Sequence, residues 1–594
     1  MNEERFDYIV VGAGTAGCLL ANRLSADPST RVLLVEAGGE DRYLWIHIPV
    51  GYLYCIGNPR TDWLFRTVEE PGLGGRSIGY PRGKVFGGSS SINGMIYMRG
   101  QRGDYDRWAA DANPGWSWDE VLPYFVRHED HHTLDAGGSD PLHGHGGEWR
   151  VERARVTWEI LDAFRDAAAQ AGIPPSDDFN RGDNFGCGYF EVNQKRGVRW
   201  NASKAFLRPV LHRPNLKVVT HAQVTGLVRR TDGSGRVEGI EYRIGGPSGE
   251  SKRTLCDGEV VLSAGAIGSP QILQCAGIGA GARLREAGVT PVTELPGVGA
   301  NLQDHLQLRM IYKVRNVRTL NQQASSLIGK AGIGLEYLLF RSGPMSMSPS
   351  QLGAFARSSD GESSPDLEYH VQPLSLDRFG EPLHDFPAFT ASVCHLRPSS
   401  RGEVRITSPD PFAAPRIAPN YLSTEQDRRV GGGAPGGTPP MVGGVGVGWV
   451  GAGGGQSRPA WRTEGGGARA AAHPPHRRHR RDAPLRAGGD QARPGVPNRG
   501  RARAGGRRSR HDDLPPGRHL QDGAVQRPDG GRRCPAALSS GAGVEDRRCV
   551  GDADDHLGQH EFPDADDRRE GGRDDAHRPA AALRRRRWRP FRQW

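Results

Sequence analysis

The 594-residue sequence lacks several features that would place it in other classes of protein. Its eight cysteines contain no Cys-x-x-Cys pair, which argues against a zinc ribbon or a redox dithiol, and scattered single thiols fit a reducing compartment. No apolar run reaches transmembrane length, and residues 1–7 lack the basic-then-apolar pattern of a signal peptide. We therefore expect a soluble, cytoplasmic protein without a transmembrane segment, and we leave peripheral contact with a membrane open.

Lysine is absent after Val430, whereas arginine accumulates there. The formal net charge of +10 would suit a nucleic-acid partner, but much of it belongs to this Arg-rich tail. We therefore expect no nucleic-acid partner, and an interaction protein that uses the tail remains an alternative. The residues before Val430 have the composition of an ordinary α/β protein, and the chain is too long for one hydrophobic core. Two or more domains are expected.

A dinucleotide-binding pattern begins near the amino terminus. An apolar run at residues 8–11 leads into Gly12-Ala13-Gly14-Thr15-Ala16-Gly17, and a helical pattern follows at residues 18–24. A second predicted strand, residues 31–35, ends at Glu36. Strand, glycine loop, helix, strand and acid in this order predict a site for FAD or NAD.

Each residue of this pattern has a physical role. Gly12 permits the tight turn, Gly14 lets a pyrophosphate approach the backbone, and Gly17 lets the helix lie close to the strand. The start of the helix offers free N–H groups and a positive dipole end to phosphate. Glu36 stands where a carboxylate would accept hydrogen bonds from ribose hydroxyls. A glycine turn in another α/β protein would not explain Glu36.

A second glycine-rich segment spans residues 81–100 and combines small residues with apolar ones. Gly87-Gly88-Ser89-Ser90-Ser91 can place backbone N–H groups and hydroxyls against a polar ligand. A bare surface linker would not carry the apolar residues Ile92, Met95, Ile96 and Met98. The segment is therefore predicted to form part of a binding site.

Three long motifs make the chain similar to the glucose–methanol–choline (GMC) oxidoreductase family. Residues 83–106 resemble the first family signature, with Phe86 in place of the usual leucine. Residues 265–279 resemble the second signature, with Ala276 in place of serine. Residues 296–305 resemble the segment that contacts the flavin late in the family's FAD-binding domain.

The resemblance implies an α/β fold in which a Rossmann-type FAD-binding domain is interleaved with an α+β substrate-binding domain. We expect the FAD-binding domain at residues 1–160 and 215–312, and the substrate domain at residues 161–214 and 313–429. Residues 430–594 form an aberrant low-complexity tail, for which disorder is expected from its Gly, Pro and charged residues.

The resemblance also implies which residues bind FAD. Val224 would contact the adenine through its backbone, and Ile92 occupies the position where some family members attach the flavin covalently to histidine, so non-covalent FAD is expected. The implied cofactor-binding residues are Gly12, Gly14, Gly17, Glu36, Ala37, Gly87, Gly88, Ser89, Asn93, Gly94, Val224, Ala264, Gly265 and Asp304.

The implied activity is oxidation of a primary alcohol to an aldehyde, with hydride transfer to flavin N5. The Ser-Ile-Asn-Gly-Met run that ends at Met95 and the segment 395–402 are similar to choline dehydrogenases and to bacterial aliphatic-alcohol dehydrogenases. The partners would be a small-molecule alcohol and an electron acceptor: oxygen, a quinone or another carrier. A histidine would serve as the base, because its ordinary pKa of about 6.5 lies near neutral pH.

The family's two catalytic motifs are absent after Tyr421, so no catalytic residue can be named. The family pattern continues to Val430 and then stops. When codons are read one base later, residues 511–523 permit Thr-Thr-Ile-Phe-His-Pro-Val-Gly-Thr-Cys-(Lys or Arg)-Met, which is the missing histidine motif. Residues 554–567 permit Thr-Thr-Ile-Ser-Gly-Asn-Thr-Asn-Ser-Pro-Thr-Leu-Met, the missing partner motif. We interpret the tail as the product of a shifted reading frame.

Under this interpretation no histidine of the tail has a catalytic role. His519 and His560 are accidents of the frame. His473, His476 and His479 lack the accompanying acid or cysteine spacing of a metal site, and no metal is expected. A genuine disordered tail is the alternative, since a shifted GC-rich gene would have the same composition.

Two further groups of residues, one aromatic and one polar, each have two alternative roles. Trp108, Trp116, Trp118 and Tyr124 are expected to pack in the core and on the surface rather than to form a substrate cage. Residues 366–372 predict a strand on which Glu368, His370 and Gln372 share one face. That face would either line a substrate pocket or be an exposed polar surface.

The shifted frame can be tested on the gene itself. Sequencing of the gene across codons 425 to 435 should reveal an insertion or deletion that restores both motifs. Independent reads that agree on the printed frame would contradict the interpretation.

Overall fold

The computed structural model describes residues 4–377 and 381–431, which belong to one compact unit. The predictions for residues 432–594 lie outside the described residues. These are the disordered tail and the assignments of His473, His476, His479, His519 and His560.

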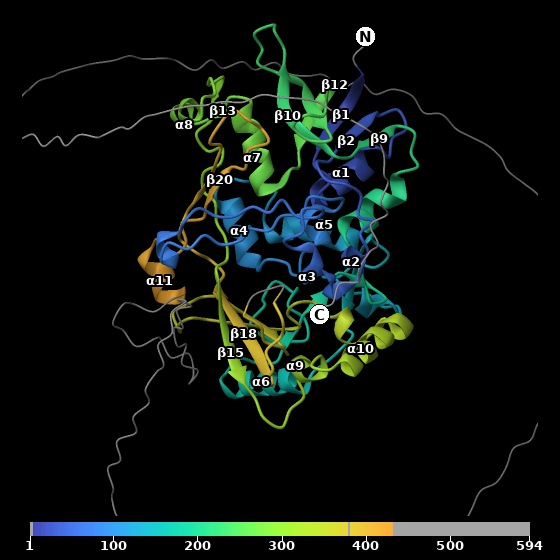
Figure 1. Cartoon of the computed structure of the whole chain (residues 1–594), viewed down its shortest axis with the longest axis vertical. Coiled ribbons are helices and arrows are strands. Elements are labelled where there is room, and N and C mark those ends of the chain that lie inside the picture. Colours follow the sequence, from blue (N-terminus) through green and yellow to red (C-terminus); the bar gives the residue numbers. More distant parts are fainter. Residues whose placement is uncertain (1–3, 378–380, 432–594) are drawn as a thin grey trace, which may run out of the picture. The chain divides into compact units, whose positions relative to one another are not determined.

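The first of two main sheets has six strands in the order β10-β11-β12-β1-β2-β9 (Figure 1). β12, β1, β2 and β9 are parallel neighbours, whereas β10, β11 and β12 pair antiparallel. The strands are β1 (Arg5–Val11), β2 (Val32–Val35), β9 (Leu216–Val219), β10 (Ala222–Arg229), β11 (Val237–Ile244) and β12 (Glu250–Leu262).

Both faces of this sheet are covered, which explains the continuous apolar character of β1 and β2. On one face, Val10 and Leu34 pack against helix α1 (Thr15–Leu24) and against Phe206. On the other face, Ile9 and Leu33 pack against residues of β10 and β11. The predicted strand–loop–helix–strand unit is confirmed, although β1 starts three residues before the predicted strand.

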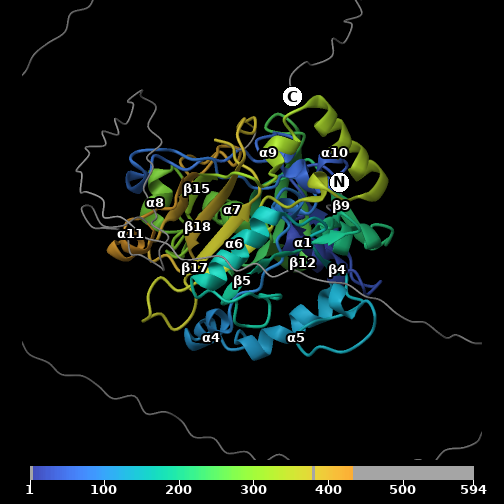
Figure 2. The same ribbon diagram turned by 90° about the horizontal axis from the view of Figure 1, so that it is seen from below.

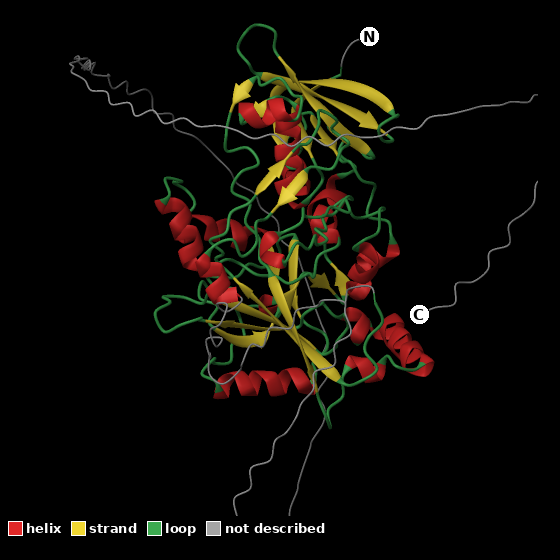
Figure 3. Ribbon diagram, turned by 60° about the vertical axis from the view of Figure 1, so that its left-hand side comes forward, coloured by secondary structure: helices red, strands yellow, loops and turns green. Residues whose placement is uncertain are grey.

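The second sheet has five strands in the order β15-β18-β17-β16-β5, all paired antiparallel. In Figure 3 the strands, drawn in yellow, gather into an upper and a lower group, and this sheet belongs to the lower one. Helix α6 (Glu159–Gln170) lies across one of its faces (Figure 2). There Leu161 and Ala168 pack against the apolar residues of the strands. The strands are β5 (Gly186–Tyr189), β15 (Gln307–Lys313), β16 (Leu352–Ala356), β17 (Leu367–Gln372) and β18 (Ala388–His395).

Smaller elements connect and flank the sheets. A three-stranded sheet contains β3 (Glu129–His131), β4 (Trp149–Arg153) and β6 (Glu191–Val192). Paired two-residue or three-residue strands are β7 (Gln194–Lys195), β8 (Val198–Arg199), β13 (Ile278–Gly279), β14 (Thr293–Glu294), β19 (Glu403–Arg405) and β20 (Arg416–Ala418). The remaining helices are α2 (Leu44–His47), α3 (Tyr52–Cys55), α4 (Arg102–Ala110), α5 (Trp118–His128), α7 (Gly265–Cys275), α8 (Gly281–Glu286), α9 (Leu320–Gln323), α10 (Leu327–Phe340) and α11 (Glu425–Gly431).

The α/β class is therefore confirmed, with a Rossmann-type sheet whose strands alternate along the chain with those of an antiparallel sheet. The domain boundaries themselves remain predictions. The six cysteines among the described residues are free. None of the described helices combines the length and the apolar character that crossing a bilayer requires.

The polar strand predicted at residues 366–372 exists as β17, but its polar face is not exposed. The side chains of Glu368 and His370 are only 12% and 14% exposed, and Nε2 of His370 lies 3.1 Å from the Glu368 carboxylate. The alternative of an exposed surface is therefore wrong. The four aromatic residues expected to pack in the core and on the surface do both. Trp118 of α5 is buried, whereas Trp108, Trp116 and Tyr124 are exposed.

Candidate cofactor site

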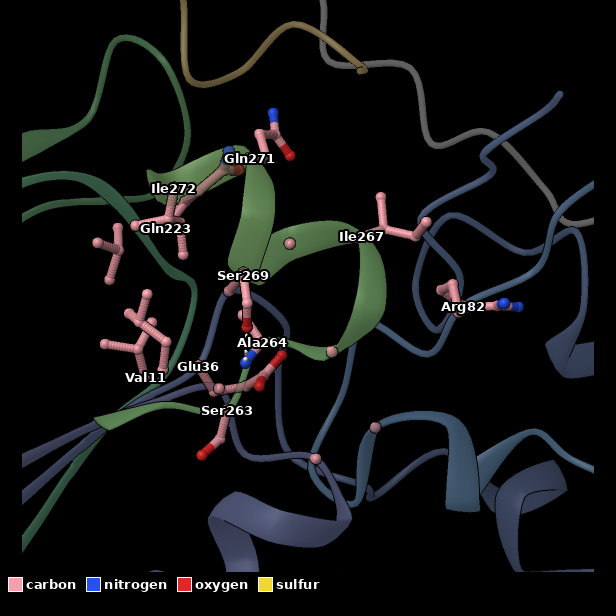
Figure 4. A pocket seen from close by; sticks show the side chains of 18 of the residues that line it. Val11, Glu36, Arg82, Gln223, Ser263, Ala264, Ile267, Ser269, Gln271 and Ile272 are labelled. Carbon is pink, nitrogen blue, oxygen red and sulfur yellow. Dashed lines mark hydrogen bonds between the residues drawn. The ribbon is translucent and has the colours of Figure 1, made fainter. Parts of the chain in front are cut away.

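A pocket of about 550 Å³ lies at the carboxyl ends of β1 and β2 (Figure 4). Its walls come from the first glycine loop, the segment after β2, the second glycine segment, β10 and the start of α7. These segments are far apart in sequence, and the parallel strands bring their ends to one edge of the sheet. Ligands of such sheets bind at this edge.

Two helices begin at the pocket. Gly14 precedes α1 and Ala264 precedes α7, and neither helix has a side-chain cap on its first N–H groups. Gly14, Ala264 and the first residues of both helices line the pocket. Uncapped N–H groups and the positive ends of two helix dipoles therefore face the same space, which suits a pyrophosphate.

The glycine residues permit contacts that a side chain would prevent. Gly12 has a φ of +96°, and a Cβ there would lie 2.8 Å from the carbonyl oxygen of Ser263. A Cβ on Gly17 would lie 1.8 Å from the carbonyl oxygen of Gly12, so the helix can approach the strand only with glycine. Gly88 has a φ of +52°, and its Cβ would lie 2.8 Å from Cα of Gly14. The two glycine segments are thus in direct contact.

Glu36 is buried at the end of β2, where it faces the pocket. Its two carboxylate oxygens accept hydrogen bonds from the N–H groups of Ala13 (2.7 Å) and Gly38 (2.8 Å). Burial raises the pKa of Glu36 to about 7, although these hydrogen bonds and the nearby Lys84 lower it. The carboxylate therefore braces the glycine loop and still presents lone pairs to the pocket.

The structure brings most of the predicted cofactor residues together. Those that line the pocket are Gly12, Gly14, Glu36, Ala37, Gly88, Ser89, Val224, Ala264 and Gly265. Gly17 supports the loop from behind, and Gly87 donates its N–H to the Ala13 carbonyl (2.8 Å) beside the pocket. Asn93, Gly94 and Asp304 do not line this pocket.

Asn93 belongs to a second polar centre that the sequence did not predict. Its Oδ1 accepts a hydrogen bond from Nη1 of Arg199 (2.9 Å), and the same nitrogen donates to the Ser90 carbonyl (3.1 Å). The Arg199 side chain is fully buried, and its Nε and Nη2 have no hydrogen-bond partner within the described residues. Burial lowers the pKa of Arg199 to about 10. A buried cation beside the glycine–serine segment fits an anionic cofactor.

Gly94 and Asp304 are held by other neighbours. A Cβ on Gly94 would lie 3.2 Å from the ring of Pro349, so this loop approaches the segment before β16 closely. The carboxylate of Asp304 accepts a hydrogen bond from the Tyr421 hydroxyl. Among the residues that line the pocket, Arg82 supplies a positive side chain, and it lies on a different segment from Glu36 (Figure 4).

The described residues also contain groups of acidic residues, cysteine and histidine close enough to hold a metal ion. These groups do not follow a local metal-binding motif in the sequence, because the fold brings together residues from different segments.

The sheet edge, the two uncapped helix starts and the buried acid after β2 define a dinucleotide-binding oxidoreductase fold. The model of the GMC oxidoreductase family matches residues 6–307. The chain therefore belongs to the GMC oxidoreductase family, and its cofactor is FAD. The fit is supported by the glycine residues and the two uncapped helix starts, because their exposed backbone N–H groups favour an anionic group such as the pyrophosphate of FAD.

Curated relatives agree with this family. The chain is 38% identical to the alcohol dehydrogenase (acceptor) of Pseudomonas putida over 423 residues, which cover 71% of this chain and 75% of the relative. It is 40% identical to the oxygen-dependent choline dehydrogenase of Photobacterium profundum over 428 residues, 71% of this chain and 73% of the relative. It is also 38% identical to human mitochondrial choline dehydrogenase, with 72% and 71% covered.

Solved structures share the fold. A pyridoxine 4-oxidase from Mesorbium loti is similar with a TM-score of 0.63 and 32% identity, over 72% of this chain and 78% of that chain. A formate oxidase is similar in fold with a TM-score of 0.65 and 24% identity, over 72% and 79%. The matched length of 423 residues is close to the 430 residues that precede the change of composition after Val430.

Replacement of Glu36 by glutamine should weaken FAD binding, because a neutral amide replaces the charged acceptor of the ribose hydroxyls. A hydrogen bond to a charged group contributes about 1.5–3 kcal/mol, so the Kd for FAD should rise about tenfold to a hundredfold. Fluorescence titration of the apoprotein measures this. The exposed Glu69→Gln variant is the control, and an unchanged Kd in Glu36→Gln would contradict the role.

The same titration should depend on pH. Ribose hydroxyls donate to the ionised carboxylate, so bound FAD lowers the raised pKa of Glu36 and its binding releases a proton. Affinity for FAD should therefore increase as the pH rises towards about 7 and level off above it. Glu36→Gln should remove this dependence.

Proposed function

We propose that this chain, in an undisturbed reading frame, oxidises the CH–OH group of a primary alcohol to an aldehyde. The candidate substrates are choline and aliphatic alcohols. Relatives with about 40% identity are named choline dehydrogenase and alcohol dehydrogenase, and the sequence resemblance adds the aliphatic class. The observation that carries the proposal is the FAD pocket of an oxidoreductase fold in a chain whose matched relatives are choline and alcohol dehydrogenases.

The bound FAD would supply the hydride acceptor, and the described residues would hold it. We propose that Glu36, Ala37 and Val224 contact the adenosine half, and that the helix starts at Gly14 and Ala264 contact the pyrophosphate. Arg199 holds Asn93 through its side chain and Ser90 through the backbone, and so fixes the loop expected next to the isoalloxazine. Proton transfer needs a base, for which no residue can be named among those described.

The second, antiparallel sheet would supply residues that border the substrate-binding space. Glu368 and His370 lie on one face of β17, and α6 covers the opposite face of the sheet, where Val371 belongs to the apolar core. Paired with each other and mostly buried, these two side chains form a polar patch in the interior. We propose that this patch borders the space in which the alcohol binds.

A catalytically dead, flavin-binding remnant is the second candidate for the chain as printed. It is favoured by the absence of both family motifs from the printed sequence after Tyr421. It differs from the first candidate only in the segment beyond Val430, so the two share the same FAD pocket.

The two candidates give opposite results in one anaerobic experiment. The chain with its frame restored should lose its oxidised flavin absorbance when mixed with choline or a primary aliphatic alcohol. The chain as printed should keep it, because it lacks the base that takes the hydroxyl proton. Bleaching of the printed chain, or no bleaching of the restored chain by any primary alcohol, would contradict the proposal.

For the location, we propose a cytoplasmic protein with peripheral contact with membranes. The support is the outer face of α10, where large apolar side chains lie in solvent within the described part of the structure. Ile328 is 86% and Leu338 is 68% exposed, and Leu327, Leu335 and Leu339 extend this face. Exposed apolar patches of this kind mark interaction surfaces.

Cosedimentation with vesicles of phosphatidylcholine and phosphatidylglycerol tests this contact. The double variant Ile328→Gln/Leu338→Gln should bind vesicles severalfold less, because it removes apolar area from the face of α10. Leu44→Gln, which changes a leucine on α2 that is about as exposed as Leu338, should bind like the original chain. Equal binding by all three proteins would contradict the assignment.

A further inference from the structure

A second candidate site lies in the small three-stranded sheet. His131 ends β3, His132 begins the short 3₁₀ helix that follows, and Glu191 begins β6. We call these three residues the His–Glu cluster. Adjacent residues of a strand point to opposite faces, but here the chain turns after His131, so both histidines can face the same carboxylate.

The three donor atoms of the cluster converge. Nε2 of His131 lies 3.0 Å from Oε1 of Glu191, and Nε2 of His132 lies 2.8 Å from the same oxygen. All three ligand atoms lie within 4.8 Å of one another. The His131 and Glu191 side chains are 1% and 7% exposed, whereas His132 is 15% exposed and opens the cluster towards solvent.

The charge of Glu191 has no strong cation to balance it. The ion pairs of Glu191 among the described residues are with these two histidines and not with arginine or lysine. The contact from His131 Nε2 also lacks hydrogen-bond geometry, so this buried nitrogen has no satisfied partner in the described structure.

In the neighbouring groups of acidic residues and histidines, the charged side chains are already paired with one another or with arginine. Glu129 is paired with Arg99 (2.8 Å) and with His143 (3.1 Å), and His143 is also paired with Asp178 (3.0 Å). A metal ion at Glu129 would have to displace these partners. In the outer group, Arg150 already pairs with the acids Asp130 and Asp135.

We propose that His131, His132 and Glu191 bind a divalent transition-metal ion, for which zinc is the best match. Two imidazole nitrogens and one carboxylate oxygen are ligands that zinc accepts, at about 2.0–2.2 Å. In a tetrahedral site, ligand atoms at these distances lie about 3.3–3.6 Å apart. The observed separations of 2.8 and 3.0 Å would therefore have to widen by about 0.5 Å. Water would occupy the fourth position on the open side of His132.

The surrounding residues orient the ligands as metal sites require. Nδ1 of His131 lies 2.8 Å from the hydroxyl of Thr133 and accepts a long hydrogen bond (3.4 Å) from the Thr133 N–H. When Nε2 binds the ion, Nδ1 carries the proton and can donate it to the hydroxyl, in place of that long hydrogen bond. The amide of Asn180 donates to Oε2 of Glu191 (3.3 Å) and leaves Oε1 for the metal. Such outer contacts fix the ring tautomer and the carboxylate orientation.

Metal binding here would stabilise the loop of the cofactor site. The backbone carbonyl of Glu191 accepts the N–H of Tyr97 (2.9 Å), and Ile96 pairs with Val192 in a β-bridge. This stretch directly follows Asn93 and Gly94. An ion that binds only the folded chain raises its stability in proportion to the logarithm of its concentration over Kd.

The experiment uses the full chain with FAD bound, first freed of metal by a chelator. After dialysis against a small excess of Zn²⁺ and removal of free ion, elemental analysis should find one zinc per chain above the His132→Ala variant. Thermal unfolding should shift to higher temperature with Zn²⁺ in the original chain only. With Co²⁺ in place of Zn²⁺, visible bands beyond the flavin absorption should appear and indicate nitrogen–oxygen tetrahedral coordination.

Matched variants separate this site from its neighbours. His132→Ala and Glu191→Gln should each lower zinc affinity at least tenfold, whereas His145→Ala, at an exposed histidine of the outer group, should bind zinc like the original chain. If Glu191→Gln does not fold, the more exposed His132→Ala still decides the question. The proposal is overturned if no zinc is retained, or if His132→Ala retains it with unchanged affinity, which would leave only a hydrogen-bonded cluster.

Discussion

The contact between the two glycine segments is the constraint on which the rest of the site depends. Gly88 lies so close to Gly14 that a Cβ would be 2.8 Å from its Cα, and Gly87 donates to the Ala13 carbonyl. One loop belongs to the first strand–helix unit and the other follows about seventy residues later. Their contact closes the pocket beside the sheet edge and brings the start of α1 to the second glycine segment.

Electrostatics then determines what this pocket can hold. Two helix starts and Arg82 face it, while Arg199 is buried behind the second glycine segment without an acidic partner among the described residues. An isolated buried charge is costly, so such an arrangement persists where a ligand compensates it. Glu36 is the counterpart at the other end, where a hydrogen-bond acceptor is needed instead of a cation. The pocket thus offers positive groups to the pyrophosphate of a dinucleotide and a hydrogen-bond acceptor, Glu36, to its ribose.

The parts of the site that follow from local sequence were predictable. The glycine loop, α1, β2 and Glu36 are one continuous unit, in which the spacing of apolar residues and glycines determines the geometry. The family resemblance added Val224, Ala264 and Gly265, which line the same pocket. Arg199 and the His–Glu cluster were missed, because their partners lie far away in sequence: Asn93 is 106 residues from Arg199, and Glu191 is 59 residues from His132. Arg199 ends the two-residue strand β8, and such a position gives no local sign that its side chain will be buried.

The polar face of β17 shows a second property that local sequence does not determine, namely whether a predicted face is buried or exposed. Alternation along a strand predicted that Glu368 and His370 share a face, and this is confirmed, but it could not tell burial from exposure. That depends on what the fold places against the strand.

The central claim, a non-covalent FAD in the pocket formed by the two glycine segments, is tested most directly by the purified protein itself. Chain with a restored frame, expressed with riboflavin supplied, should show the two visible absorption bands of oxidised flavin. Acid precipitation should release one FAD per chain into the supernatant, because Ile92 cannot form a covalent bond to the flavin. A folded protein that is colourless and does not take up added FAD would contradict the account.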